Sequence, residues 1–323
     1  MTTDADARRE EVLAALVEAP GGVSGQDLAD RLGCSRAAVH RHVEALRRAG
    51  VAVDGAHEGY VLLPGADPVS GLAATRALDG TGAGPVRWLA ETGSTNDDAV
   101  AAARDGAPEG LVIGAEHQTR GRGRRGRDWR ANPGDALLFS VLLRPGGDIE
   151  TAGALPVLAA VAVTDALGPG AGVIWPNDVV VNGRKVCGIL CEMGADESGV
   201  DWVVAGIGIN VRGVPALGDA RWTPGSVADA GAAPRRHDLL VAVLGALWAR
   251  YRAWAADGAA DALAAFASRD LLAGRGVTVA VGAERVEGTA AGVDDRGRLR
   301  VRTAAGERAL SAGEVTRVEH GPA

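Results

Sequence analysis

Residues 118–129, QTRGRGRRGRDW, decide which nucleotide-binding folds this chain can adopt, because the run holds three glycines and five arginines. Gly121, Gly123 and Gly126 match the GxGxxG pattern of a dinucleotide-binding loop. Such a loop opens a helix, whereas here Asn132-Pro133-Gly134 breaks the chain and a strand-like run follows. A P-loop is excluded too, since GxxxxGK followed by Ser or Thr occurs nowhere in the sequence.

What remains is a flexible arginine loop. Its glycines permit close approach of the backbone, and its guanidinium groups can fork onto a phosphate or a carboxylate. The simpler alternative is a solvated basic loop that binds nucleic acid without specificity, and the other segments of the chain disfavour it.

On both sides of this loop, apolar strand-like runs alternate with alanine-rich helical stretches. The expected strands are 111–116, 137–143, 173–175, 179–181, 186–193 and 202–209, and the expected helices are 96–104, 152–167 and 237–257. A sheet and helices that share one core predict an α+β domain with a mixed sheet over residues 66–270.

Residues 271–323 have a different pattern. After Gly274, short runs at 277–281, 285–293, 299–303 and 307–311 alternate with Gly-containing turns. We expect a small all-β barrel here.

Residues 1–65 predict a winged helix-turn-helix. Helices are expected at 8–19, after the cap Ser24, and at 36–49 after the cap Ser35, with Gly33 ending the second. Runs 51–53 and 60–63 would form the hairpin of the wing. The third helix carries an excess of positive charge, so we expect it to contact DNA through Ser35, Arg36, His40 and Arg41. The alternative is a helical hairpin that only packs on the rest of the chain.

Composition restricts the remaining possibilities. The net charge of -7 argues against a surface that coats nucleic acid, and leaves room only for a local basic patch. Three cysteines without CxxC spacing indicate neither a disulfide framework nor a zinc site. The acidic N-terminus lacks a signal-peptide pattern and no apolar run approaches the length of a membrane span, so we expect a cytoplasmic protein.

Three further segments contain residue types suited to chemistry. In Trp175-Pro176-Asn177-Asp178, carboxylate and amide oxygens could serve magnesium or a ribose. The hairpin signal Asn182-Gly183 places Lys185 at the start of a strand, where it can reach into a cleft. Gly93-Ser94-Thr95-Asn96 is a strand-to-helix junction that helix capping alone would explain. Small residues in 205–210 leave space on one strand face for a ligand or another backbone.

Together these segments resemble the biotin-protein ligase family, and with the winged helix ahead of them they look like its bifunctional ligase and biotin-operon repressor branch. The specific marks are Ser94-Thr95-Asn96, residues 121–129, Trp175-Pro176-Asn177-Asp178, Lys185 with Gly188-Ile189-Leu190, and Gly206-Ile207-Gly208-Ile209-Asn210. By the same resemblance, the C-terminal barrel would be the SH3-like cap of the family.

The resemblance implies biotin-[acetyl-CoA-carboxylase] ligase activity with ATP, Mg²⁺ and biotin. The biotin site would contain Ser94, Thr95, Asn96, Gln118, Arg122, Gly123, Arg124, Lys185 and Gly188. ATP would be bound by Trp129, Asn177, Asp178 and Asn210, with Mg²⁺ at Asp178. Charge on the reacting phosphorus would be stabilised by Arg124, Arg127 and Lys185. The implied partners are a biotin carboxyl carrier domain, operator DNA, and a second copy of the chain once the adenylate is bound.

Two departures from the family pattern are visible. Ile174 stands where ligases of this family commonly carry a lysine, and the wing has an acid, Glu58, where a base is expected. Two alternatives stay open: a transcription factor that senses biotin without turnover, and a lipoate ligase, which uses similar chemistry. Retention of the whole arginine loop with Lys185 favours the biotin ligase.

Overall fold

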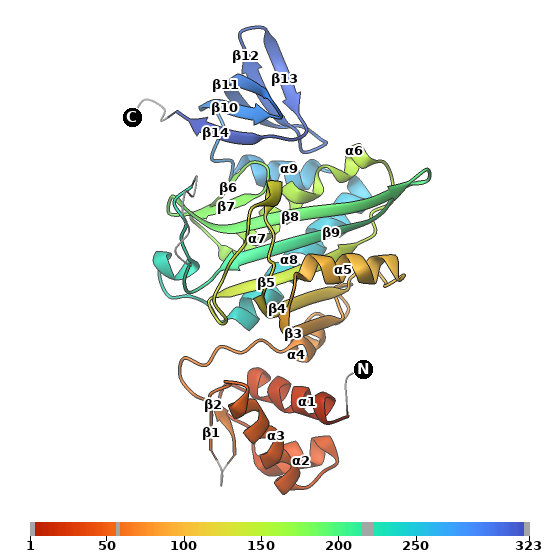
Figure 1. Cartoon of the computed structure of the whole chain (residues 1–323), viewed down its shortest axis with the longest axis vertical. Helices are drawn as coiled ribbons and strands as arrows, with labels where there is room; N and C mark the ends of the chain where they lie inside the picture. Colours follow the sequence, from red (N-terminus) through yellow and green to blue (C-terminus); the bar gives the residue numbers. More distant parts are fainter. Residues whose placement is uncertain (1–3, 56–58, 215–221, 320–323) are drawn as a thin grey trace.

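The structure is a computed structural model that describes residues 4–55, 59–214 and 222–319. Figure 1 shows three parts stacked along the long axis of the molecule: N-terminal helices at one end, a large sheet in the middle and a small antiparallel sheet at the other end. This arrangement confirms the α+β class, the N-terminal helix-turn-helix and the central mixed sheet expected from the sequence.

The central sheet has the strand order β3-β4-β5-β9-β8-β7-β6. β3 and β4 pair in parallel, and the other neighbouring strands are antiparallel. The bounds are β3 Val86–Thr92, β4 Val112–Gln118, β5 Ala136–Leu143, β6 Ala171–Ile174, β7 Asp178–Val181, β8 Arg184–Asp196 and β9 Gly199–Asn210.

Helices cover both faces of this sheet. α7 (Leu155–Leu167) and α8 (Arg236–Asp257) lie on one face, with α9 (Ala260–Ala267) packed against both of them. α5 (Thr95–Arg104) lies on the other face. The central strand β5 is buried along its whole length, which explains why its sequence is apolar apart from Ser140 and does not alternate.

The strands β3 and β14 (Glu314–Val318) and the helices α4 (Gly71–Ala77) and α9 were not predicted from the sequence. The helix expected over 152–167 is observed as α7, which begins at Leu155 with Pro156 in its first turn, and the short helix α6 (Ile149–Ala152) precedes it and ends at Gly153. Proline is tolerated there because the first amides of a helix have no intrahelical partner.

Two stretches are long and apolar enough to cross a membrane by composition alone, 149–167 and 236–257. The expectation that no apolar run approaches this length was therefore wrong. In the structure both stretches contribute to the core beneath the central sheet, where Leu158, Leu240 and Leu244 are fully buried.

The winged helix contains α1 (Asp4–Glu18), α2 (Gly25–Leu32), α3 (Arg36–Arg48), β1 (Val53–Asp54) and β2 (Val61–Leu62). The predicted caps are confirmed, since the Ser24 hydroxyl accepts from the amide of Asp27 and the Ser35 hydroxyl from that of Ala38. Gly33 takes the left-handed conformation that ends α2. The wing residue Glu58, an acid where a base was expected, lies outside the described residues.

Helix α4 joins this domain to the central one. Ala73 packs into the core of the winged helix, while Ala74 and Leu78 pack into that of the central domain. Glu10 of α1 accepts hydrogen bonds from Ser70 and from the amide of Leu72 at the start of α4. The boundary predicted at residue 65 therefore stays a prediction, because the first helix after it contributes to both cores.

The C-terminal strands β10 (Gly276–Val281), β11 (Glu284–Val293), β12 (Leu299–Thr303), β13 (Gly306–Leu310) and β14 form one antiparallel sheet in the order β13-β12-β11-β10-β14. Closure of this sheet into a barrel stays a prediction. The sheet is attached to the central domain, where the indole of Trp175 donates to the carbonyl of Gly297 over 2.8 Å.

Candidate active site

A cavity of about 430 Å³ lies on the α5 side of the central sheet, above β8 and β9. Glycines form its floor, because a Cβ added to Gly208 or Gly188 would come within 2.5 or 2.9 Å of the Trp129 ring. The indole of Trp129 therefore rests on the backbone of both strands. This confirms that small residues leave space on one face of β9, and Trp129 occupies part of that space.

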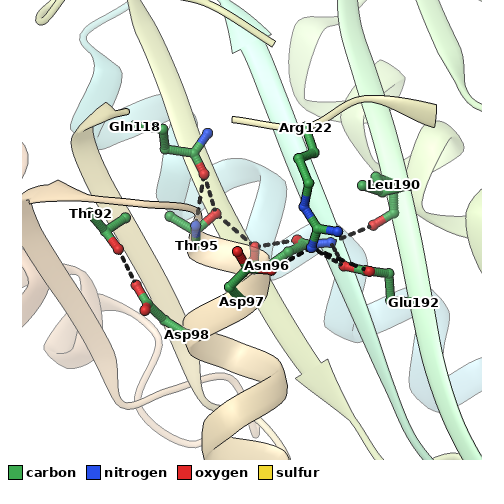
Figure 2. A network of polar contacts seen from close by, with 10 residues as sticks. Thr92, Thr95, Asn96, Asp97, Asp98, Gln118, Arg122, Leu190 and Glu192 are labelled. Carbon is green, nitrogen blue, oxygen red and sulfur yellow. Dashed lines mark hydrogen bonds and ion pairs between the residues drawn. The ribbon is translucent and has the colours of Figure 1, made fainter. Parts of the chain in front are cut away.

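The N-terminus of α5 forms one wall of the cavity, where β4 and β5 hold it in place. Gln118 accepts hydrogen bonds from the amide and the hydroxyl of Thr95, over 2.7 and 3.1 Å, as Figure 2 shows. The buried hydroxyl of Ser140 lies 2.8 Å from Thr95 Oγ1 and donates to Asn96 Oδ1 over 2.6 Å. Ser94 occupies the cap position but makes no side-chain cap, so capping alone does not explain this segment.

Arg124 is the most buried arginine of the loop. Its guanidinium donates to Asn177 Oδ1 over 2.9 Å and to the carbonyl of Gly313 over 3.3 Å. Burial lowers the pKa of Arg124, and the nearby carboxylate of Asp178 opposes this effect. Since an arginine guanidinium stays charged in proteins, the loop places a partly desolvated cation at the cavity.

Two other arginines of the loop bind the C-terminal sheet. Arg125 and Arg127 both form ion pairs with the carboxylate of Glu314, at the start of β14. Arg127 was predicted to stabilise the reacting phosphorus. It lines the cavity, but its side chain is more than half exposed and engaged by Glu314.

Lys185 reaches the cavity because of a β-bulge. Along β8 the pairing with β7 shifts, so that Val179 lies opposite Cys187 and Val180 opposite Lys185, with Val186 as the extra residue. Regular alternation from Gly188 would point Lys185 toward the buried side, and the bulge turns it to the cavity side instead. There the ammonium group lies 2.7 Å from Asp178 Oδ1.

Two of the predicted nucleotide-site residues are held by neighbouring backbone. Asn177 also donates to the carbonyl of Ile189 over 2.7 Å, so its amide is engaged at both ends. The amide of Asn210 donates to the carbonyl of Gly225 over 3.1 Å. Both residues therefore shape the wall of the cavity from fixed positions.

The structure brings together every residue that the sequence analysis assigned to the biotin and ATP sites. The cavity is lined by Ser94, Thr95, Asn96, Gln118, Arg122, Gly123, Arg124, Arg127, Trp129, Asn177, Asp178, Lys185, Gly188 and Asn210. The residues assigned to DNA lie elsewhere, on α3 of the winged helix, and all four are exposed: Ser35, Arg36, His40 and Arg41.

Three residues of the site and its supporting network were missed. Ser140 had a visible signal, a lone hydroxyl inside the apolar run 137–143. Glu192 and Glu314 had none, because each is an ordinary acid in a strand whose partner comes from a distant segment.

No group of three potential metal ligands occurs within the described parts of the chain. Cys187 is fully buried and Cys191 partly so, and burial raises the pKa of the Cys191 thiol to about 12. Cys187 is therefore a core residue, and Cys191 packs against the same core.

Comparisons with known proteins agree with this architecture part by part. The model of the Biotin/lipoate A/B protein ligase family matches residues 92–210, that of an HTH domain residues 8–61, and that of the Biotin protein ligase C terminal domain residues 273–317. Three domains in this order define the class of protein: a ligase domain between a helix-turn-helix and a C-terminal cap.

Individual relatives support the same class of protein. The chain is 39% identical over 239 residues to the biotin--[acetyl-CoA-carboxylase] ligase of Mycobacterium tuberculosis, covering 70% of this chain and 86% of that protein. It is also 39% identical to the bifunctional ligase/repressor BirA of Bacillus spizizenii, where the alignment spans 59% of this chain and 60% of that protein. A biotin protein ligase from Aquifex aeolicus, solved in complex with biotin and ATP, superposes with a TM-score of 0.61 at 25% identity, covering 73% of this chain and 99% of that one. The chain belongs to the biotin protein ligase family.

Proposed function

We propose that this protein is a biotin-[acetyl-CoA-carboxylase] ligase, which activates biotin with ATP and transfers it to a lysine of a biotin carboxyl carrier domain. The observation that carries the proposal is the meeting of Arg124, Lys185 and the N-terminus of α5 at one cavity. Two cations around one anion site suit a reaction that joins a carboxylate to a phosphate. The relatives named as ligases support the same activity.

In the first half-reaction, the carboxylate of biotin attacks the α-phosphorus of ATP, pyrophosphate leaves, and biotinyl-5′-AMP forms. Negative charge builds up on the phosphorus oxygens, so Arg124 and Lys185 would stabilise it. No residue needs to form a covalent bond, because orientation of the two substrates supplies much of the rate. Gln118 and Thr95, which line the cavity, would offer hydrogen bonds to biotin.

In the second half-reaction, the amine of the acceptor lysine attacks the mixed anhydride and AMP leaves. Exclusion of water from the cavity would protect the anhydride from hydrolysis in the interval. The site offers Mg²⁺ a single protein ligand, the carboxylate of Asp178, because the amide of Asn177 is already hydrogen-bonded. Mg²⁺ is commonly bound by one or two carboxylates together with substrate phosphates, and it neutralises charge on those phosphates. We therefore propose that it arrives with ATP at Asp178.

We further propose that the protein is cytoplasmic and that its winged helix represses transcription. The exposed face of α3 presents Arg36, His40 and Arg41, and its cap Ser35 lies at the end that would enter the major groove. Dimerisation on binding of the adenylate is part of this proposal. It accounts for how occupation of the cavity could control binding to a symmetric operator.

The experiment that tests the ligase combines the protein with ATP, magnesium, labelled biotin and a carrier domain, and compares the wild type with Lys185→Ala. Loss of one group that stabilises transition-state charge should slow turnover by about 100- to 1,000-fold. Tight binding of biotin with neither pyrophosphate release nor transfer would refute the enzyme and favour a biotin-sensing repressor. Transfer of lipoate in preference to biotin would favour the lipoate ligase.

A further inference from the structure

The carboxylate of Glu192 connects the interior of the sheet to an arginine at the mouth of the cavity. Its Oε2 accepts from Asn96 Nδ2 over 2.8 Å and from Arg122 Nη2 over 3.2 Å. Figure 2 shows both contacts, with Glu192 reaching from β8 toward the N-terminus of α5. The side chain of Glu192 is 31% exposed, so it lies at the edge of the site.

Asn96 is fixed before it contacts Glu192. It is 5% exposed, its Oδ1 accepts from the fully buried hydroxyl of Ser140, and its Nδ2 also donates to the carbonyl of Leu190 over 3.2 Å. Gly206 makes room for it, because a Cβ there would collide with the amide oxygen. With both amide hydrogens donated, Asn96 is a support for its neighbours and a poor candidate for direct contact with biotin.

Arg122 is anchored on one side only. Its Nη2 makes the contacts to Glu192 and one to Asp97 Oδ1, over 2.5 Å. The Asp97 side chain is 48% exposed. Exposed ion pairs restrict a long side chain weakly, whereas a carboxylate hydrogen-bonded to a buried amide has a defined position. Of the two acids, Glu192 is therefore the one that can fix the direction of the guanidinium.

We propose that Glu192 is a positioning residue for the ligase reaction: it holds Arg122 so that the rest of its guanidinium faces the biotin carboxylate. The chain of contacts runs from Ser140 through Asn96 and Glu192 to Arg122. The buried residues thereby restrict the orientation of a long, partly exposed side chain. This inference rests on the proposed function, since it assumes that Arg122 meets biotin.

Three variants separate position from charge. Glu192→Ala removes the anchor, and Glu192→Asp keeps the charge but is one methylene too short to reach both Asn96 and Arg122. Asp97→Ala is the matched control, because it removes an acid from the same guanidinium nitrogen without touching Asn96. For each, the dissociation constant of biotin without ATP is measured by calorimetry, and KM for biotin, KM for ATP and kcat by transfer to the carrier domain.

Both Glu192 variants should weaken biotin binding and raise KM for biotin by about tenfold, the equivalent of one hydrogen bond to a charged group. KM for ATP should change less than about twofold, and Asp97→Ala should stay within about twofold throughout. Unchanged biotin binding in the Glu192 variants would overturn the proposal. So would a wild-type result for Glu192→Asp, or an Asp97→Ala effect equal to that of Glu192→Ala, because either means that charge alone acts.

Different results would refute the proposed ligase activity and the proposed role of Glu192. A wild-type protein that binds biotin but transfers none refutes the proposed ligase, while the binding measurements still decide the role of Glu192. A wild-type protein with full turnover and unaffected Glu192 variants refutes the positioning role alone.

Discussion

Replacement of Gly206 by alanine should disrupt the hydrogen-bond network that holds the N-terminus of α5 in place. The new Cβ would overlap the amide oxygen of Asn96, which lies against the backbone of β9. Asn96 would have to leave its hydrogen bonds to Ser140, Leu190 and Glu192. A buried polar group left without a partner costs about 1–3 kcal/mol, and the Asn96 amide, which is 5% exposed, would lose its partners at both its oxygen and its nitrogen, whereas Ser140 keeps its contact with Thr95. The variant should therefore be less stable by about 2–5 kcal/mol.

Denaturant unfolding measures this loss, and two further variants control it. Gly245→Ala, inside α8 with open space around the new methyl, should stabilise the protein by up to about 1 kcal/mol. In an Asn96→Ala background the amide is gone, so Gly206→Ala should cost much less than in the wild type. A loss below about 1 kcal/mol, or equal costs in both backgrounds, would show that contact with Asn96 is not what requires a glycine here.

Four other substitutions, at three positions, test separate parts of the structure. Arg236→Leu should cost about 3–5 kcal/mol in denaturant unfolding, because it leaves Asp67 and Glu116 without a buried guanidinium that is 3% exposed; a loss near zero would contradict this reading. Burial lowers the pKa of His237, so the unfolded chain binds the proton more readily; stability should rise with pH up to about 6.5, and His237→Gln should flatten that rise in unfolding measured against pH. Ser35→Ala should destabilise the winged helix by about 1 kcal/mol. Ser35→Asp should keep the cap yet weaken operator binding in a gel-shift titration, and equal binding by Ser35→Asp and wild type would place Ser35 away from DNA.

Local signals were sufficient for much of the fold. Ser24, Gly33 and Ser35 mark helix ends through bonds to their immediate neighbours, so the sequence alone reveals them. The Asn182-Gly183 turn is equally local, since both residues take positive φ as a two-residue hairpin requires. The strand β3 was missed because only Val86 along it is fully buried and its pattern does not alternate at this edge of the sheet.

By itself the sequence determined the three-part organisation, the family resemblance and many of the residues that line the candidate site, because these depend on residue types and their order along the chain. The tertiary structure alone decided how these residues act on one another. The bulge at Val186 turns Lys185 to the cavity side, Glu314 of the C-terminal sheet pairs with Arg125 and Arg127, and Glu192 on β8 contacts Asn96 on α5. Such contacts join residues far apart in the chain, and their geometry is set by strand register and domain packing, for which one sequence carries no local signal.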